Sequence, residues 1–208
     1  LHVQALKEYL LKKYEGDDRQ LFAITRAFNK IKRAKLERHI QEHEFLTYDQ
    51  IIDLCMRLTP RMSLIVQGLF LTGLRVEELL SIRLDDIAVN GKVIIHVRSA
   101  KGGKEFTVYL PVNVYNEIVA VFEGTKYLFE TTGHKKYNQS NVRKELKRQG
   151  RKYGYEIHPH LFRHSKGMYL KDVMKLSPDQ VAKALNHANV KTTLEHYFHG
   201  SPTADDMG

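Results

Sequence analysis

HPHLFRHSKGMYL, residues 158–170, is the stretch of the sequence that decides the fold. Pro159 suits the first turn of a helix, because a proline at that position gives up no helical hydrogen bond. His160, Arg163 and His164 then follow at i, i+3 and i+4 and therefore share one helix face. The start of a helix also offers unpaired N–H groups, so a phosphate bound here would meet backbone and side-chain donors together.

Zinc binding is the rival interpretation of these histidines. His160 and His164 have the i, i+4 spacing of metalloprotease ligands, but Leu161 stands where that motif needs its glutamate, and Arg163 would repel a cation. We therefore expect no metal and no cofactor. A third interpretation, in which the histidines only pack or face solvent, stays open for this stretch taken alone.

Composition narrows the class of protein. The chain has 208 residues, 42% of them hydrophobic, which is enough for a sizeable core. It has no run of 18 apolar residues and no long apolar signal region at its beginning, so we expect a soluble, cytoplasmic protein without a membrane partner. Its single cysteine, Cys55, lies within the periodic stretch IIDLCMRL and reads as a buried thiol. The formal net charge of +9 favours a polyanion as partner, with nucleic acid first.

The positive charge is concentrated in residues 135–152, where eight Lys or Arg accompany one acid, Glu145. Helical spacing begins at about Ser140, so the segment would present a cationic ridge along a helix. A solvated helix face is the alternative to contact with a phosphate backbone. The expected DNA-binding side chains are Lys104, Lys135, Lys136, Arg143, Lys144, Lys147, Arg148 and Arg151.

The remaining pattern predicts a mainly α fold with a small β-hairpin, an α+β class. Caps and periodicity predict helices near residues 3–15, 18–42, 48–58, 60–72, 75–82, 112–123, 140–152, 160–174 and 178–185. Two β-rich runs, KVIIHVR and EFTVYLP, are joined by SAKGGK, which reads as a hairpin with a Gly-rich tip. The break at 43–46 divides the chain into a helical segment, residues 1–45, and a domain, residues 46–208.

Two further stretches carry candidate chemistry. TGLRVEELLSI, residues 72–82, sets Arg75 on a first helical turn with Glu78 one turn on, where a carboxylate can orient a guanidinium. LNHANVKTTLEHY, residues 185–197, passes Asn186, a residue that tolerates a left-handed cap, and then gives His187 and Tyr197.

Four features of the sequence, taken in order, resemble the motifs of the tyrosine recombinase family, of the phage integrase and Xer type. They are GLRVEELLSIRLDDI, the hairpin lysine of SAKGGK, HLFRH and LNHANVKTTLEHY. The resemblance covers roughly residues 46–199. It implies a catalytic domain preceded, in residues 1–45, by a partial or reduced helical core-binding domain. It departs from the family at Asn186, where a glycine is usual, and in the 11 residues that follow Tyr197, where many relatives have a further helix.

The resemblance also implies roles for single residues. Arg75 and Arg163 would grip the nonbridging phosphate oxygens, with Glu78 supporting Arg75. Tyr197 would be the nucleophile, and a tyrosine, with its ordinary pKa of about 10, needs neighbours that favour its phenolate. The other expected roles are His160 as base, Lys101 or its neighbour Lys104 as general acid, His187 as a hydrogen-bond partner of the phosphate, and His164 as a structural residue.

The expected function is therefore that of a site-specific DNA recombinase or integrase. It would cut and rejoin double-stranded DNA through a 3′-phosphotyrosyl link without ATP or metal. It would be a monomer or weak oligomer when free, a homotetramer on two DNA sites, and associated with the nucleoid when bound. Three alternatives remain open: a type IB topoisomerase, a noncatalytic DNA-binding relative, and an unrelated basic DNA-binding module, which would leave the order of the motifs unexplained.

Overall fold

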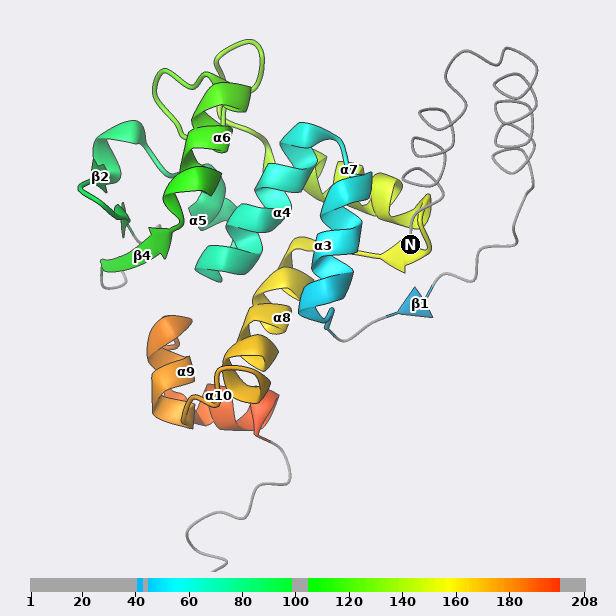
Figure 1. The fold of residues 1–208 in the computed structure, drawn as a ribbon, viewed down its shortest axis with the longest axis vertical. Helices are drawn as coiled ribbons and strands as arrows, with labels where there is room; N and C mark the ends of the chain where they lie inside the picture. The colour runs from blue at the N-terminus through cyan, green and yellow to red at the C-terminus, as the bar shows by residue number, and fades with distance from the viewer. Residues whose placement is uncertain (1–40, 43–44, 99–104, 199–208) are drawn as a thin grey trace, which may run out of the picture. The chain divides into compact units, whose positions relative to one another are not determined.

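Helices form most of the part of the chain that the computed structural model describes, residues 41–42, 45–98 and 105–198 (Figure 1). All of these residues belong to the unit that begins at Ile40. The described helices are α3 (Tyr48–Arg57), α4 (Pro60–Thr72), α5 (Val76–Leu80), α6 (Val112–Phe122), α7 (Gln139–Arg151), α8 (Pro159–Asp172), α9 (Pro178–Ala184) and α10 (Val190–Tyr197), with a 3-10 turn at Leu84–Asp86.

Helix α4 lies at the centre of the core. Eight of its residues are buried, on all sides of the helix, so it is surrounded by protein. It packs against α3, α6, α8 and strand β4 (Phe106–Leu110). Its ends are those that the sequence predicts: Pro60 occupies the first turn, and Gly73 stops the helix with a left-handed backbone, φ 69°.

A three-stranded antiparallel sheet covers another side of α4, in the order β2 (Ile87–Val89), β3 (Val93–Val97), β4. The predicted hairpin is β3 paired with β4, in a register that sets Val93 opposite Leu110 and Ile95 opposite Val108. These four side chains are buried, as alternation of apolar residues along each strand predicts. Strand β2 was not predicted. The hairpin tip, with Lys101 and Lys104, lies outside the described residues.

The structure corrects the end of the helix predicted for residues 18–42. Gln41 and Glu42 form a short strand, β1, which pairs in parallel with β5 (Tyr155–Glu156). The strand places residues 41–42 beside β5, the strand that follows α7. The rest of the helical segment predicted for residues 1–45 lies almost entirely outside the described residues.

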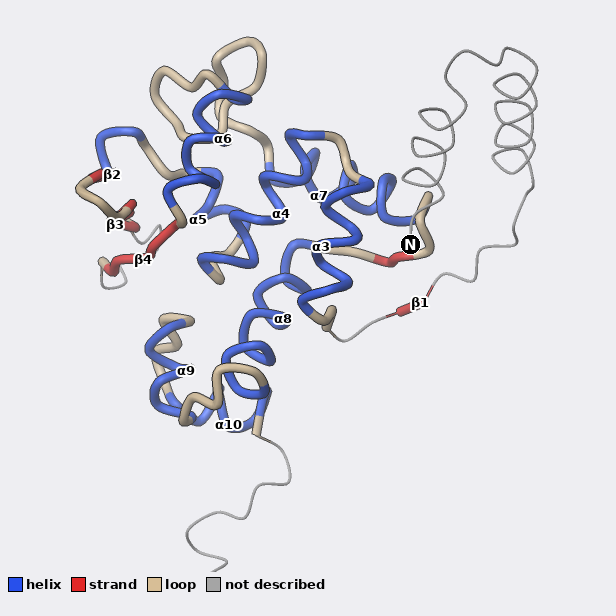
Figure 2. The backbone as a smooth tube through the Cα atoms, in the orientation of Figure 1, coloured by secondary structure: helices blue, strands red, loops and turns tan. Residues whose placement is uncertain are grey.

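Helices α9 and α10 pack on the second half of α8 (Figure 2). Their apolar side chains form a separate cluster there. Its buried members are Leu170 from α8, Val181, Leu185 and Tyr197. Helix α10 was not predicted, because its eight residues carry only two buried side chains, too few for a visible apolar stripe. Among the described residues, no helix is long and apolar enough to cross a membrane.

Candidate active site

Arg75 lies between the end of α4 and the first turn of α5. The Glu78 carboxylate accepts a hydrogen bond from the Arg75 backbone N–H at 2.8 Å and another from its Nη1 at 3.1 Å. The Arg75 side chain is 60% exposed and that of Glu78 only 13%. A nearly buried carboxylate therefore orients a guanidinium that faces solvent, which is the contact expected from the sequence.

Arg163 lies in the opposite environment, almost fully buried on α8. Its Nη1 donates to the backbone carbonyl of Gly73 and its Nη2 to that of Leu185, each at 2.6 Å. A guanidinium has five N–H donors, so three take no part in these two hydrogen bonds. Burial, and then the nearby charge of Arg75, lower the Arg163 pKa, but an arginine stays protonated at neutral pH. Arg163 thus joins three segments and still presents a fixed cation.

Arg75, Arg163 and His160 line one pocket, with a volume of about 520 Å³. The pocket walls come from the turn before α5, from α7 and from the start of α8. Its other lining residues are Leu74, Val76, Arg143, Lys147, Glu156, Ile157, His158 and Pro159. Lys147 is paired with Glu156 at 2.8 Å, and the other cations of the lining are Arg75, which is paired with Glu78, Arg143 and Arg163. This balance of charge suits a phosphate.

Two histidines stand at the pocket where α8 begins. His160 has its pKa lowered, first by burial and then by the charge of Arg163. His158 was missed as a site residue; it precedes Pro159 and is the N-cap of α8, with its Nδ1 accepting from the Leu161 backbone N–H at 3.2 Å. Burial also lowers the pKa of His158. Both shifts favour the neutral ring at pH 7. Of the two, His160 is the candidate proton acceptor, because His158 already uses Nδ1 to accept the Leu161 N–H. The sequence does contain a signal for the N-cap role of His158, because the residue before a proline that begins a helix occupies the cap position.

Tyr197 ends α10 and lies on α8 rather than in the pocket wall. Its ring lies nearly parallel to that of His187, with centroids 6.2 Å apart, and meets His164 edge-on at 5.1 Å. Burial raises the pKa of Tyr197, while the charge of Arg163 acts in the opposite direction. The structure therefore divides the predicted residues into a cationic pocket and an adjoining aromatic group that contains Tyr197.

His187 is held from the side by Thr193, with 2.7 Å between His187 Nδ1 and Thr193 Oγ1. Burial, followed by the charges of Arg163 and Arg75, lowers its pKa to about 4. His187 is thus a neutral ring at pH 7, suited to hydrogen bonding and not to carrying charge. Asn186, just before it, has φ 50°, the left-handed backbone that the sequence suggested.

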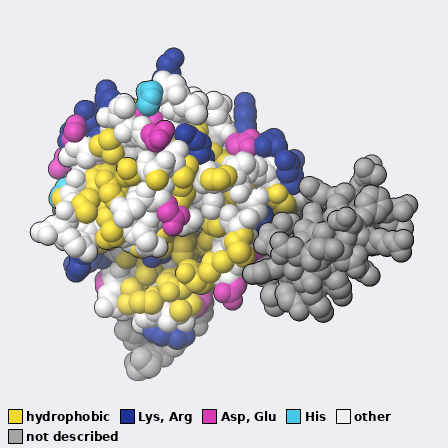
Figure 3. Space-filling view, turned by 45° about the horizontal axis from the view of Figure 1, so that its top comes forward, with side chains coloured by type: hydrophobic (Ala, Val, Ile, Leu, Met, Phe, Trp, Pro, Cys, Tyr) yellow, Lys and Arg dark blue, Asp and Glu magenta, His cyan; other side chains and the backbone are white. Residues whose placement is uncertain are grey.

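The cationic ridge predicted on α7 is partly neutralised within the protein. Arg148 binds Glu145, which has its pKa lowered to about 2, mainly by that arginine. Arg151 and Lys147 both bind Glu156 of β5, an acid from outside the segment that was predicted to be basic. On the face drawn in Figure 3, hydrophobic side chains form a broad area and most Lys and Arg side chains lie toward its edges.

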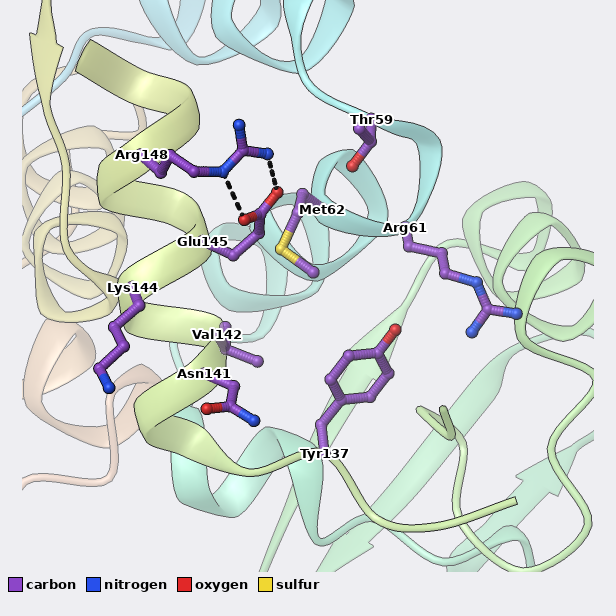
Figure 4. Close-up of a pocket in the computed structure, with 9 residues that line it drawn as sticks. All are labelled: Thr59, Arg61, Met62, Tyr137, Asn141, Val142, Lys144, Glu145 and Arg148. Carbon is purple, nitrogen blue, oxygen red and sulfur yellow. Dashed lines mark hydrogen bonds and ion pairs between the residues drawn. The ribbon is translucent and has the colours of Figure 1, made fainter. Parts of the chain in front are cut away.

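A second pocket, of about 510 Å³, lies on the other side of α7 (Figure 4). Lys144 and Arg148 line it, together with Arg61 and Tyr137, and Figure 4 shows Arg148 turned onto Glu145. Helix α7 therefore presents cations on two sides: Arg143 and Lys147 toward the candidate active site, Lys144 and Arg148 away from it.

The other predicted contacts are more dispersed. Lys136 Nζ donates to Ser81 Oγ, and Lys135 is exposed. Lys101 and Lys104 lie outside the described residues, so their expected roles remain predictions. Within the described ranges, no group of three or more His, Cys, Asp or Glu side chains is placed to hold a metal ion.

Comparison with known proteins identifies the same region. The model of the phage integrase family matches residues 43–203. The chain is 32% identical over 203 residues to a protein named tyrosine recombinase XerA from Thermococcus kodakarensis, covering 93% of this chain and 67% of that one. It is also 32% identical to the XerA of Pyrococcus furiosus, covering 93% and 66%. The chain thus spans about two thirds of the length of these curated relatives.

Solved structures share the fold. A crystal structure of XerA recombinase has a TM-score of 0.66 at 23% identity and matches 99% of this chain and 79% of the other. The integrase of transposon Tn1549, solved with a circular intermediate DNA, has a TM-score of 0.65 at 16% identity and matches 97% of this chain and 82% of the other. At these identities the likeness is one of fold.

Proposed function

The chain belongs to the phage integrase family of tyrosine recombinases, and we propose that it is a site-specific DNA recombinase that cuts and rejoins double-stranded DNA through a 3′-phosphotyrosyl intermediate. The observation that carries the proposal is the pocket shared by Arg75 and Arg163. The two guanidiniums come from segments far apart in the sequence, and internal hydrogen bonds fix both. Donors fixed before the reaction stabilise developing negative charge most effectively.

In the proposed reaction the two arginines bind the nonbridging oxygens of the scissile phosphate. The Tyr197 hydroxyl attacks phosphorus and gives its proton to His160, whose lowered pKa keeps the ring free to accept it. A bond forms between phosphorus and the tyrosine oxygen as the bond to the 5′ oxygen breaks. That 5′ oxygen takes a proton from Lys101, or from Lys104. His187 donates a hydrogen bond to a phosphate oxygen from its ring N–H.

The intermediate keeps a phosphodiester linkage, so a 5′ hydroxyl from a second strand can reverse the step without ATP. The wider assignments extend this proposal. Residues 46–208 form the catalytic domain, and residues 1–45 contribute part of a core-binding domain. The protein acts in the cytoplasm on the nucleoid, and four copies assemble on two DNA sites. Exposed side chains of the basic region that no described acid pairs, Arg143 and Lys144 above all, contact flanking phosphates.

The test is covalent capture of the intermediate. The protein is incubated in EDTA with end-labelled DNA from its native locus, carrying a nick that prevents rejoining. The mixture is then boiled in SDS and separated on a gel. We expect label on the native protein, none on Tyr197→Phe, and native levels on Tyr109→Phe, which removes the hydroxyl of an exposed tyrosine of β4.

Label that persists on Tyr197→Phe would refute the assigned nucleophile. Label that requires added metal would refute the proposed chemistry. If labelling behaves as expected but the protein relaxes supercoiled plasmid and never joins two sites, its function is that of a topoisomerase and the recombinase proposal fails.

A further inference from the structure

We propose that Gly167 is a positioning residue, because its missing side chain leaves the space in which the Tyr197 ring lies. The inference rests on the proposed function, since it concerns how the assigned nucleophile is placed. A Cβ atom at Gly167 would lie 2.3 Å from Cζ of Tyr197, 2.4 Å from Cε1 and 2.8 Å from the hydroxyl oxygen. Ordinary van der Waals contact begins at 3.4 Å, so even an alanine would have to displace the ring by about 1 Å.

The surroundings leave the ring little room to yield. The His187 ring lies nearly parallel to it with centroids 6.2 Å apart, and the His164 ring meets it edge-on at 5.1 Å. Leu170, Val181 and Leu185 complete the apolar cluster in which the ring is buried. A well-packed interior resists displacement of a rigid side chain, so the α8 backbone at Gly167 acts as the floor of a fitted site.

The hydroxyl is the polar end of this buried side chain. Tyr197 makes no side-chain hydrogen bond to any described residue. Among those residues, the one buried side-chain nitrogen or oxygen without a hydrogen-bond partner is Nε of Arg83. The Tyr197 hydroxyl oxygen is therefore not fully enclosed, although the residue as a whole is only 5% exposed.

Helix geometry connects this site to the phosphate pocket. Gly167 follows Arg163 by four residues, which places both on one face of α8 with a rise of about 6 Å between them. Arg163 is itself fixed by the carbonyls of Gly73 and Leu185. The position of the phenol relative to the bound phosphate is thus set by one helical turn of α8 and by the absence of a side chain at Gly167.

The first test needs no DNA. An alanine at a helix-interior glycine ordinarily raises Tm, here by about 1–4 °C for a chain of this size. We expect Gly167→Ala to raise Tm when made in a Tyr197→Ala protein, where the site is empty, and to lower it in the native background. An equal rise in both backgrounds would overturn the proposal. If Gly167→Ala alone fails to fold, the double variant should fold, and failure of both would equally overturn it.

The second test separates positioning from packing. A displacement of about 1 Å at a reacting group costs on the order of 100-fold in rate. We expect Gly167→Ala to lower the single-turnover rate of covalent-complex formation by about that factor at saturating DNA, with an unchanged Kd for DNA. A native rate would overturn the positioning role. Tyr197→Phe that still forms the complex would instead mark failure of the proposed function, while the Tm comparison would continue to report on the fit of ring and glycine.

Discussion

Replacing each of the two pocket arginines by lysine should separate their structural contributions. Arg163 donates to two buried carbonyls that belong to different segments, those of Gly73 and Leu185. A lysine ammonium is a single point donor on a flexible stem and keeps at most one of these contacts. A hydrogen bond from a charged donor contributes about 1.5–3 kcal/mol, so Arg163→Lys should lower the free energy of unfolding by about 2–3 kcal/mol.

Arg75→Lys is the matched variant. The Arg75 side chain is mostly exposed, and Glu78 keeps its hydrogen bond to the backbone N–H whatever the side chain. An exposed ion pair contributes up to about 1 kcal/mol, so the loss of stability should stay below that value. Both variants should lose covalent-complex formation, because neither keeps a forked donor at the phosphate.

The free energy of unfolding is measured with urea at pH 7.5, by circular dichroism, for the native protein, Arg163→Lys and Arg75→Lys. The comparison requires that the slope of this free energy against urea concentration is the same for all three proteins. Arg163→Lys within 0.5 kcal/mol of the native protein, on the order of measurement error, would contradict the double role of Arg163. An equal loss in the free energy of unfolding for Arg75→Lys and Arg163→Lys would contradict the contrast between an exposed and a buried arginine.

Three further predictions concern pH, orientation and charge. The folded protein holds the pKa of His187 near 4, below the ordinary 6.5, so the stability that His187 contributes above about pH 6.5 is lost as the pH falls toward 4. The free energy of unfolding, measured with urea at pH 7.5 and pH 5, should therefore change less between the two pH values for His187→Asn than for the native protein. An equal change in both proteins would contradict the lowered pKa of His187. Glu78→Gln should slow covalent-complex formation about five- to tenfold, with Tm almost unchanged, because a neutral amide orients Arg75 less strongly. A native rate in single-turnover assays of this variant would argue against the orienting role of Glu78. Arg143→Ala should weaken DNA binding and lower the slope of log affinity against log salt by about 1. Arg148→Ala should change the affinity and the slope less, because the Arg148 guanidinium is already paired with Glu145. Fluorescence anisotropy at several salt concentrations measures both quantities, and equal effects of the two variants would refute the distinction.

Local chemistry made several elements of the fold predictable. Thr47 and Ser177 each form a capping box with a glutamine three residues on, and their helices begin where the sequence placed them. Gly73 ends α4 through a backbone conformation that few other residues adopt without strain. Caps and glycines act within a few residues, so a single sequence shows them directly.

Features that depend on distant segments were not predictable in the same way. Glu156 neutralises two cations of α7, but it comes from a short strand whose position depends on pairing with β1. His158 enters the pocket because α8 starts beside α7; its place before Pro159 marks a helix start, but it does not indicate that α7 lies opposite. Helix α10 gains its stability from the cluster on α8 and has little apolar pattern of its own.

The stretch HPHLFRHSKGMYL, residues 158–170, has a simple physical role in the fold, because one face of α8 carries the residues of the proposed chemistry. His160, Arg163 and Gly167 follow at i, i+3 and i+7, the spacing by which an ordinary helix buries an apolar stripe. Here the same spacing delivers a neutral proton acceptor, a fixed cation and the floor beneath a tyrosine ring. The other side of α8 holds the helix in the core, where Ser165 accepts from the Leu46 backbone N–H at 2.8 Å. A rigid helix fixes the distances between these three positions, so a change that bends or slides α8 should disturb proton transfer, phosphate binding and nucleophile placement together.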